Sequence, residues 1–143
     1  MGNLIKHDHN PSPQKAKCIY LIDDEPTARF LLRILLEHQG HQCIEAEHGA
    51  SALTFLQKGN VVDLVITDDQ MPSMTGLEFL KKLPDSLPYP PPPVILYTGK
   101  MSEEVKIQAL QHGAFAVLSK PYTFPEILHA VSQALGPQSS CPG

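Results

Sequence analysis

Short apolar runs alternate with segments of helical periodicity along this chain, and this alternation restricts the fold more than any other feature. Strands are predicted over 18–22, 42–46, 64–67, 94–97 and 114–118. Runs that are almost continuously apolar, such as 18–22, are typical of strands covered on both faces. Strands that alternate with helices form βα units around a parallel sheet. The sequence therefore predicts an α/β fold with a doubly wound sheet of five parallel strands.

The segments between the strands carry the signals of helices, predicted over 26–39, 50–57, 77–83, 103–111 and 124–135. In the first of these, four apolar side chains recur at helical spacing: Phe30, Leu31, Ile34 and Leu35. Ser102 can cap the fourth helix, and Thr123 with Glu126 forms a T-x-x-E capping box before the last. The proline-rich run 88–93 predicts a stiff, extended connector, with recognition by an SH3-like or WW-like partner as the alternative.

Length and composition fit one domain and exclude several classes of protein. The 143 residues are enough for one core, and we expect a flexible arm over 1–16, a folded domain over 17–136 and a flexible tail over 137–143. A net charge of −4 without a basic stripe argues against nucleic-acid binding. No segment approaches the roughly 20 apolar residues of a membrane span. The three cysteines are widely spaced, which argues against a zinc site or disulfides and fits a reducing cytoplasm.

Polar side chains stand at the carboxyl ends of four predicted strands: Asp23, Asp24, Asp68, Thr98 and Lys120. In an open α/β sheet these ends line the crevice where ligands bind. Three carboxylates in one crevice repel each other unless a cation lies among them, and hard oxygen ligands favour Mg²⁺. A carboxylate in such a site can also act as a nucleophile and form an aspartyl phosphate. Lys120 and the hydroxyl of Thr98 could then bind the phosphoryl oxygens.

With these residues laid out, the chain resembles the response-regulator receiver family, which has the chemotaxis-protein-Y-like fold. Four pieces carry the resemblance: Leu-Ile-Asp-Asp-Glu-Pro at 21–26, Asp-Leu-Val-Ile-Thr-Asp-Asp-Gln-Met-Pro at 63–72 with Gly76 downstream, Thr98-Gly99, and Lys120-Pro121. The resemblance covers about 17–136. It implies a flavodoxin-like receiver of five βα units with the strand order 2-1-3-4-5.

The resemblance also implies roles at the site. Asp68 would accept a phosphoryl group from a histidine kinase or a phosphotransfer protein. Asp24 and Asp68 would bind Mg²⁺ together with the backbone carbonyl of Gln70, and Asp23 would orient a water on the metal or touch it.

The phosphoryl group would have two partners in the protein. Thr98 would hydrogen-bond it, Lys120 would pair with it, and the Lys120–Pro121 peptide bond would be cis. The chain would then be a cytoplasmic signalling switch rather than an enzyme with an outside substrate, and it would promote only its own phosphorylation and dephosphorylation.

Three alternatives stay open. The family often has an aromatic residue three positions before the lysine, where this chain has Val117, so a degenerate receiver that acts as a phosphate-independent interaction module is the first. Phe115 should point to the same side of its strand as Val117. A haloacid-dehalogenase-like phosphatase is the second, although Gln70 stands where that family has its second acid. A flavodoxin-like cofactor binder is the third, although no phosphate-cradling loop follows the first strand.

Output would pass through contacts with a downstream protein unless the chain is part of a longer one, and a homodimer is left open.

Overall fold

The computed structural model describes residues 17–136 and contains a five-stranded sheet in the order β2-β1-β3-β4-β5. The predicted arm and tail, 1–16 and 137–143, lie outside the described residues. All neighbouring strands are parallel, which confirms the predicted fold class and strand order. The strands are β1 (Cys18–Ile22), β2 (Gln42–Ala46), β3 (Leu64–Asp68), β4 (Val94–Thr98) and β5 (Ala116–Ser119).

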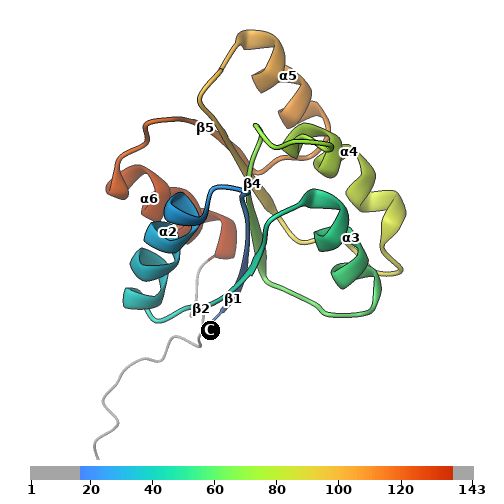
Figure 1. Cartoon of the computed structure of the whole chain (residues 1–143), viewed down its shortest axis with the longest axis horizontal. Helices are drawn as coiled ribbons and strands as arrows, with labels where there is room; N and C mark the ends of the chain where they lie inside the picture. Colours follow the sequence, from blue (N-terminus) through green and yellow to red (C-terminus); the bar gives the residue numbers. More distant parts are fainter. Residues whose placement is uncertain (1–16, 137–143) are drawn as a thin grey trace, which may run out of the picture.

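The helices cover both faces of this sheet, with α2 and α6 on one side and α3, α4 and α5 on the other (Figure 1). They are α2 (Pro26–His38), α3 (Gly49–Gln57), α4 (Gly76–Ser86), α5 (Glu103–Gln111) and α6 (Phe124–Leu135). Ser102 caps α5, and the capping box of Thr123 and Glu126 begins α6, as predicted. Helix α4 runs three residues past its predicted end. No helix within 17–136 is long and apolar enough to cross a membrane.

The sheet has a hydrophobic core on each face, and successive residues of a strand point alternately into one core and the other. On β4, Val94 and Leu96 belong to the core under α3, α4 and α5, whereas Ile95 and Tyr97 belong to the core under α2 and α6. Cys18 packs against the first core and Cys43 lies in the second, both as free thiols. The strands are therefore buried on both faces, which explains their nearly continuous apolar sequence.

Helix α2 exists as predicted, but most of the apolar residues that predicted it face solvent. Leu32 and Leu36, one helical turn apart, are the buried residues that pack on the sheet, with Leu35 partly buried beside them. Phe30, Leu31 and Ile34 are 58%, 56% and 50% exposed. The helix carries apolar side chains around much of its circumference, so its period identifies a helix but not the face that packs.

The proline-rich connector between α4 and β4 is anchored to the domain at both ends. The hydroxyl of Tyr89 donates a hydrogen bond of 2.8 Å to the carbonyl of Leu56 at the end of α3. The carbonyl of Pro93 accepts one of 3.0 Å from the amide of Val65 on β3. The run has no helix or strand of its own. It is a connector without regular structure, and hydrogen bonds attach both of its ends to the domain.

Candidate functional site

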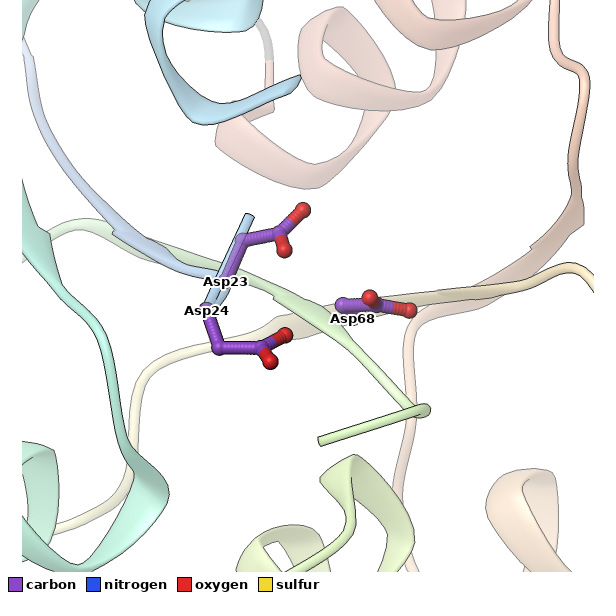
Figure 2. Close-up of side chains that lie close together, drawn as sticks. All are labelled: Asp23, Asp24 and Asp68. Atoms are coloured by element: carbon purple, nitrogen blue, oxygen red, sulfur yellow. The ribbon is translucent and has the colours of Figure 1, made fainter. Parts of the chain in front are cut away.

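Three carboxylates converge where β1 and β3 end. Asp23 and Asp24 follow β1, Asp68 is the last residue of β3, and each offers an oxygen within 4.8 Å of the others. Figure 2 shows Asp23 and Asp24 extending toward the side on which Asp68 lies. Asp23 is 1% and Asp68 3% exposed, and Asp24 is more open to solvent. The two central strands thus bring together the acids that the sequence placed at their ends.

The buried position of Asp68 makes its negative charge costly. Burial raises the pKa of Asp68, and the neighbouring charge of Asp23 raises it further. Hydrogen bonds oppose this rise, because the Gln70 amide donates to Oδ1 over 3.1 Å and Lys120 Nζ lies 3.4 Å from Oδ2. A group of carboxylate oxygens with unbalanced charge suits a small hard cation. The donor set therefore fits Mg²⁺.

Lys120 and Thr98 reach the same end of the sheet from β5 and β4. Lys120 follows β5, is joined to Pro121 by a cis peptide bond, and forms an ion pair with Asp68. Thr98 is fully buried, and its hydroxyl oxygen accepts a hydrogen bond of 3.0 Å from the Lys100 amide. In this structure the Thr98 hydroxyl supports the loop after β4. Its contact with a phosphoryl group stays a prediction.

Gln70 connects two loops at the edge of the site. Its side-chain oxygen accepts a hydrogen bond of 2.9 Å from the amide of Gly99, which follows Thr98. A Cβ on Gly99 would lie only 2.9 Å from that oxygen, so glycine makes room for this contact. The loop after β3 is therefore tied to the loop after β4. The role of the Gln70 carbonyl as a metal ligand stays a prediction.

The loop between Asp68 and α4 is shaped by its neighbours Asp69 and Gly76. Asp69 is turned toward the helix, because its side chain accepts a hydrogen bond of 2.9 Å from the Leu77 amide. A Cβ on Gly76 would lie 2.4 Å from the carbonyl oxygen of Asp68 and 2.5 Å from a methyl of Leu96. Gly76 therefore allows the start of α4 to pack closely against the strand of Asp68.

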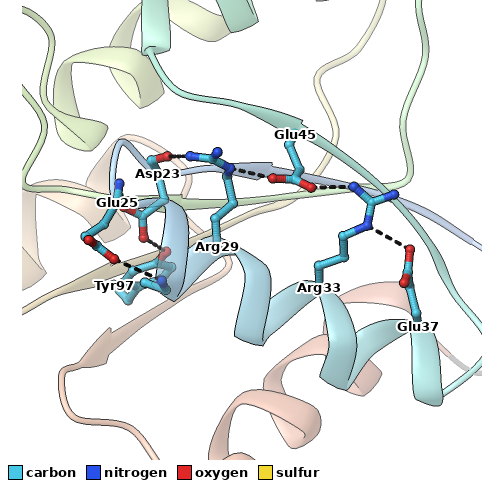
Figure 3. A network of polar contacts seen from close by, with 8 residues as sticks. Asp23, Glu25, Arg29, Arg33, Glu37, Glu45 and Tyr97 are labelled. Carbon is cyan, nitrogen blue, oxygen red and sulfur yellow. Dashed lines mark hydrogen bonds and ion pairs between the residues drawn. The ribbon is translucent and has the colours of Figure 1, made fainter.

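Sequence reasoning missed two residues that touch Asp23. The hydroxyl of Tyr97 donates to Asp23 Oδ2, and the guanidinium of Arg29 donates to the carbonyl oxygen of Asp23. Figure 3 shows both contacts, with Arg29 continuing to Glu45 on β2. Burial raises the pKa of Tyr97 well above its usual range, so the phenol is protonated and donates. A tyrosine within a strand is usually a core residue, and nothing in its sequence neighbourhood marked it.

The position of the family's aromatic residue is filled by a small side chain. Val117 on β5 is partly buried and packs against the core under α3, α4 and α5. Phe115 precedes the strand and is 45% exposed.

An apolar groove of about 400 Å³ borders the acidic cluster. Leu31 and Leu35 of α2 line one wall, and Tyr122 and Phe124 line the other. Lys120 lines the groove as well as contacting Asp68. Leu31 and Phe124 are 56% and 59% exposed, so the groove offers apolar surface to a partner beside the acceptor.

The fold and the position of the site define a class of protein. A doubly wound parallel sheet in the order β2-β1-β3-β4-β5 has its topological switch point between β1 and β3. The acidic cluster lies at the carboxyl ends of these two strands. The molecule is therefore a flavodoxin-like α/β protein with its polar site at the switch point.

Comparison with known proteins identifies the family. The family model of the response regulator receiver domain matches residues 19–132. A chemotaxis protein CheY homolog of Campylobacter jejuni is 36% identical over 111 residues, 77% of this chain and 85% of the relative. The crystal structure of a response regulator receiver domain protein from Clostridium thermocellum has a TM-score of 0.74 at 32% identity, covering 83% of this chain and 94% of its own. The chain belongs to the response regulator receiver domain family of two-component systems.

A second similar structure contains a phosphorylated aspartic acid and a bound ion. A response regulator from Burkholderia pseudomallei, with a phosphorylated aspartic acid, a calcium ion and citrate, has a TM-score of 0.72 at 25% identity. The match covers 83% of this chain and 68% of that one.

Proposed function

We propose that this protein is a phosphorylation-activated response regulator that accepts a phosphoryl group on Asp68 from a histidine kinase or a phosphotransfer protein. The observation that carries the proposal is the site itself: three carboxylates within 4.8 Å of one another, with Lys120 Nζ 3.4 Å from Asp68 Oδ2. The phosphorylated aspartic acid in the Burkholderia pseudomallei relative supports the same chemistry.

The proposed transfer uses Asp68 as the nucleophile. A carboxylate oxygen of Asp68 forms a bond to phosphorus while the phosphorus–nitrogen bond to the donor imidazole breaks. The electron pair stays on that nitrogen, which takes up a proton. Lys120 pairs with the phosphoryl oxygens, and Asp23, Asp24, Asp68 and the Gln70 carbonyl would hold Mg²⁺. When bound, Mg²⁺ offsets the carboxylate charges and stabilises the negative charge of the phosphoryl group. Loss of the phosphoryl group to water would reset the protein.

The proposed switch begins at Thr98. A phosphoryl group on Asp68 adds strong acceptor oxygens, and the Thr98 hydroxyl would turn toward them and release the Lys100 amide. The loop after β4 would then shift and bias the surface of α5 and β5. Exposed apolar side chains on α5 and before β5 make this surface suitable for a downstream protein or a second copy of the chain: Ile107, Leu110 and Phe115.

The phosphoryl donor would dock over the groove between α2 and α6. Lys120 contacts both the groove and Asp68, so a partner in the groove lies within reach of the acceptor. The free thiols of Cys18 and Cys43 support a cytoplasmic setting for this exchange. One alternative has an observation in its favour: Val117 in place of the aromatic residue fits a degenerate receiver that acts as a phosphate-independent interaction module.

Intact-mass spectrometry with acetyl phosphate and Mg²⁺ tests the proposal. We expect one added phosphoryl group on the wild type, none on Asp68→Asn, and none after chelation of Mg²⁺. Asp69→Asn is the matched control, because the asparagine oxygen can still accept from the Leu77 amide and the adduct should persist. An adduct of equal yield on Asp68→Asn would mean another acceptor. No adduct on the wild type would favour the interaction module.

A further inference from the structure

Tyr97 lies directly beside the proposed acceptor in the sheet. In the pairing of β3 with β4, Asp68 and Tyr97 are register partners. Partners in adjacent strands leave the sheet on the same face, here the face covered by α2 and α6. Tyr97 is 2% exposed, and its hydroxyl reaches past β3 to Asp23 at the end of β1. Its side chain therefore lies beneath the acidic cluster.

The hydroxyl of Tyr97 completes a set of contacts that fixes the carboxylate of Asp23. Oδ1 accepts a hydrogen bond of 2.9 Å from the Glu25 amide, and Oδ2 accepts from Tyr97. The guanidinium of Arg29 holds the backbone carbonyl of the same residue (Figure 3). Donors of the protein thus fix the position of both carboxylate oxygens. Groups that orient a ligand in this way commonly contribute to metal affinity.

The ring of Tyr97 contacts the cationic side of the site. Lys120 Nζ lies 5.1 Å from the ring centroid and 3.4 Å from Asp68 Oδ2. An ammonium over an aromatic face is attracted by the ring. Tyr122 packs against Tyr97 in an edge-on arrangement, with centroids 5.5 Å apart and planes at 65°. One buried side chain therefore contacts both Asp23, which follows β1, and Lys120, which follows β5, and these strands lie on either side of β3.

We infer that Tyr97 is a positioning residue of this site, whose hydroxyl orients Asp23 for the divalent cation and whose ring orients Lys120 for the phosphoryl group. The inference rests on the proposed function. Packing in the core would need only the ring of Tyr97. The hydroxyl instead donates a hydrogen bond to a buried carboxylate of the acidic cluster, so the role of Tyr97 goes beyond packing. It also divides the side chain into two parts that substitutions can separate.

The test compares Tyr97→Phe, which removes only the hydroxyl, with Tyr97→Leu, which removes the ring as well. Mg²⁺ affinity is measured by calorimetric titration without a phosphodonor, and the rate of Asp68 phosphorylation by acetyl phosphate is measured at saturating Mg²⁺. We expect Tyr97→Phe to weaken Mg²⁺ binding on the order of tenfold and to leave the saturated rate close to that of the wild type. Tyr97→Leu should weaken binding similarly and also lower the saturated rate.

Tyr20→Phe is the matched control, because it removes a phenol hydroxyl from another buried strand tyrosine, which lies in the core under α3, α4 and α5, and leaves the contacts of Tyr97 in place. It should match the wild type in both measurements. Should Tyr97→Leu fail to fold, Tyr97→Phe still decides the role of the hydroxyl. Unchanged or tighter Mg²⁺ binding in folded Tyr97→Phe would overturn the inference.

The same experiment separates this inference from the proposed function. Mg²⁺ binding that weakens in Tyr97→Phe, without any phosphoryl adduct on the wild type, would support the inference and contradict the proposed function. An adduct on the wild type with identical Mg²⁺ affinities would do the opposite. A wild type that binds no Mg²⁺ would overturn both.

Discussion

At Gly76 the first turn of α4 passes so close to the strand of Asp68 that a methyl group has no space. Alanine would meet the Asp68 carbonyl oxygen at 2.4 Å and Leu96 at 2.5 Å. We expect Gly76→Ala to lower the free energy of unfolding by about 1–3 kcal/mol, the usual range for an overpacked site, and to slow phosphorylation by displacing Asp68. Urea unfolding and the acetyl phosphate assay measure the two effects.

Gly49→Ala is the matched control for this substitution, since both glycines are the first residues of their helices. Its nearest new neighbour would be the Met74 sulfur at 3.0 Å, at the end of a flexible side chain. It should therefore cost less than Gly76→Ala. Equal stabilities of the two variants would contradict the explanation from close packing.

The site residues that stand at strand ends were predictable from the sequence, and the residue inside a strand was not. Asp23, Asp24, Asp68 and Lys120 stand where strands end, and parallel topology alone brings such positions together. Tyr97 lies inside β4, where an aromatic side chain satisfies the pattern of a buried strand. Its contact with Asp23 depends on the register of β3 with β4 and the reach of a side chain across one strand, which a linear sequence does not display.

At the scale of elements, α2 and β2 are joined by a charged network that should make stability depend on pH. Arg29 Nε lies 2.5 Å from Glu45, and Arg33 also contacts Glu45. The hydrogen bond from Arg29 is the main cause of a lowered pKa at Glu45. An unfolded glutamate has a pKa of about 4.3. The charge of Glu45 therefore contributes its full stabilisation of the folded state above that pH, and the stabilisation is lost as pH falls toward the lower pKa of the folded protein.

We therefore expect the wild type to be more stable than Glu45→Gln at neutral pH, and the difference to shrink as pH falls below about 4. The side chains are partly exposed and screened, so the difference should stay below about 1 kcal/mol and fall further in high salt. Urea unfolding of both proteins across this range measures it. A difference that is constant with pH would mean that the charge of Glu45 does not contribute.

The exposed side of α2 should affect docking of the protein that donates the phosphoryl group, but not phosphorylation by a small donor. Leu31→Asp places a charge in the groove beside Lys120, and we expect it to slow transfer from a phosphotransfer protein about tenfold, the effect of losing roughly 1.4 kcal/mol of contact energy. The rate with acetyl phosphate should not change. Val61→Asp, at a residue that is 68% exposed before β3, is the control and should affect neither rate. Equal slowing with both donors would indicate damage to the site rather than to docking.

The elements themselves were largely predictable, and their packing was less so. Strand ends, caps and helix periods are local signals, and β1 and β2 have the predicted bounds. Helix α4 extends to Ser86 and includes Pro84, although proline has no amide hydrogen to donate within the helix, so a proline in the sequence did not mark the helix end. The packed face of α2 depends on where the sheet and α6 lie, and that information is spread over the whole chain.

For the whole molecule, the acidic cluster should couple metal binding to folding. A ligand that binds only the folded state stabilises it by about 1.4 kcal/mol at ten times its Kd. We expect Mg²⁺ to raise the thermal midpoint of the wild type accordingly, and chelation to reverse the effect. The gain should be smaller in Asp68→Asn, which lacks one carboxylate of the cluster. The same gain in both proteins would place the stabilising Mg²⁺ elsewhere.

The anchored connector between α4 and β4 has a consequence for the unfolded chain. Five of the six residues from Pro88 to Pro93 are prolines, and each ring restricts φ before folding as much as after it. The segment therefore loses little conformational entropy when Tyr89 and Pro93 attach it to the domain. Part of the stability of this protein thus originates in the denatured ensemble. There the proline-rich segment that precedes β4 is already restricted to extended conformations.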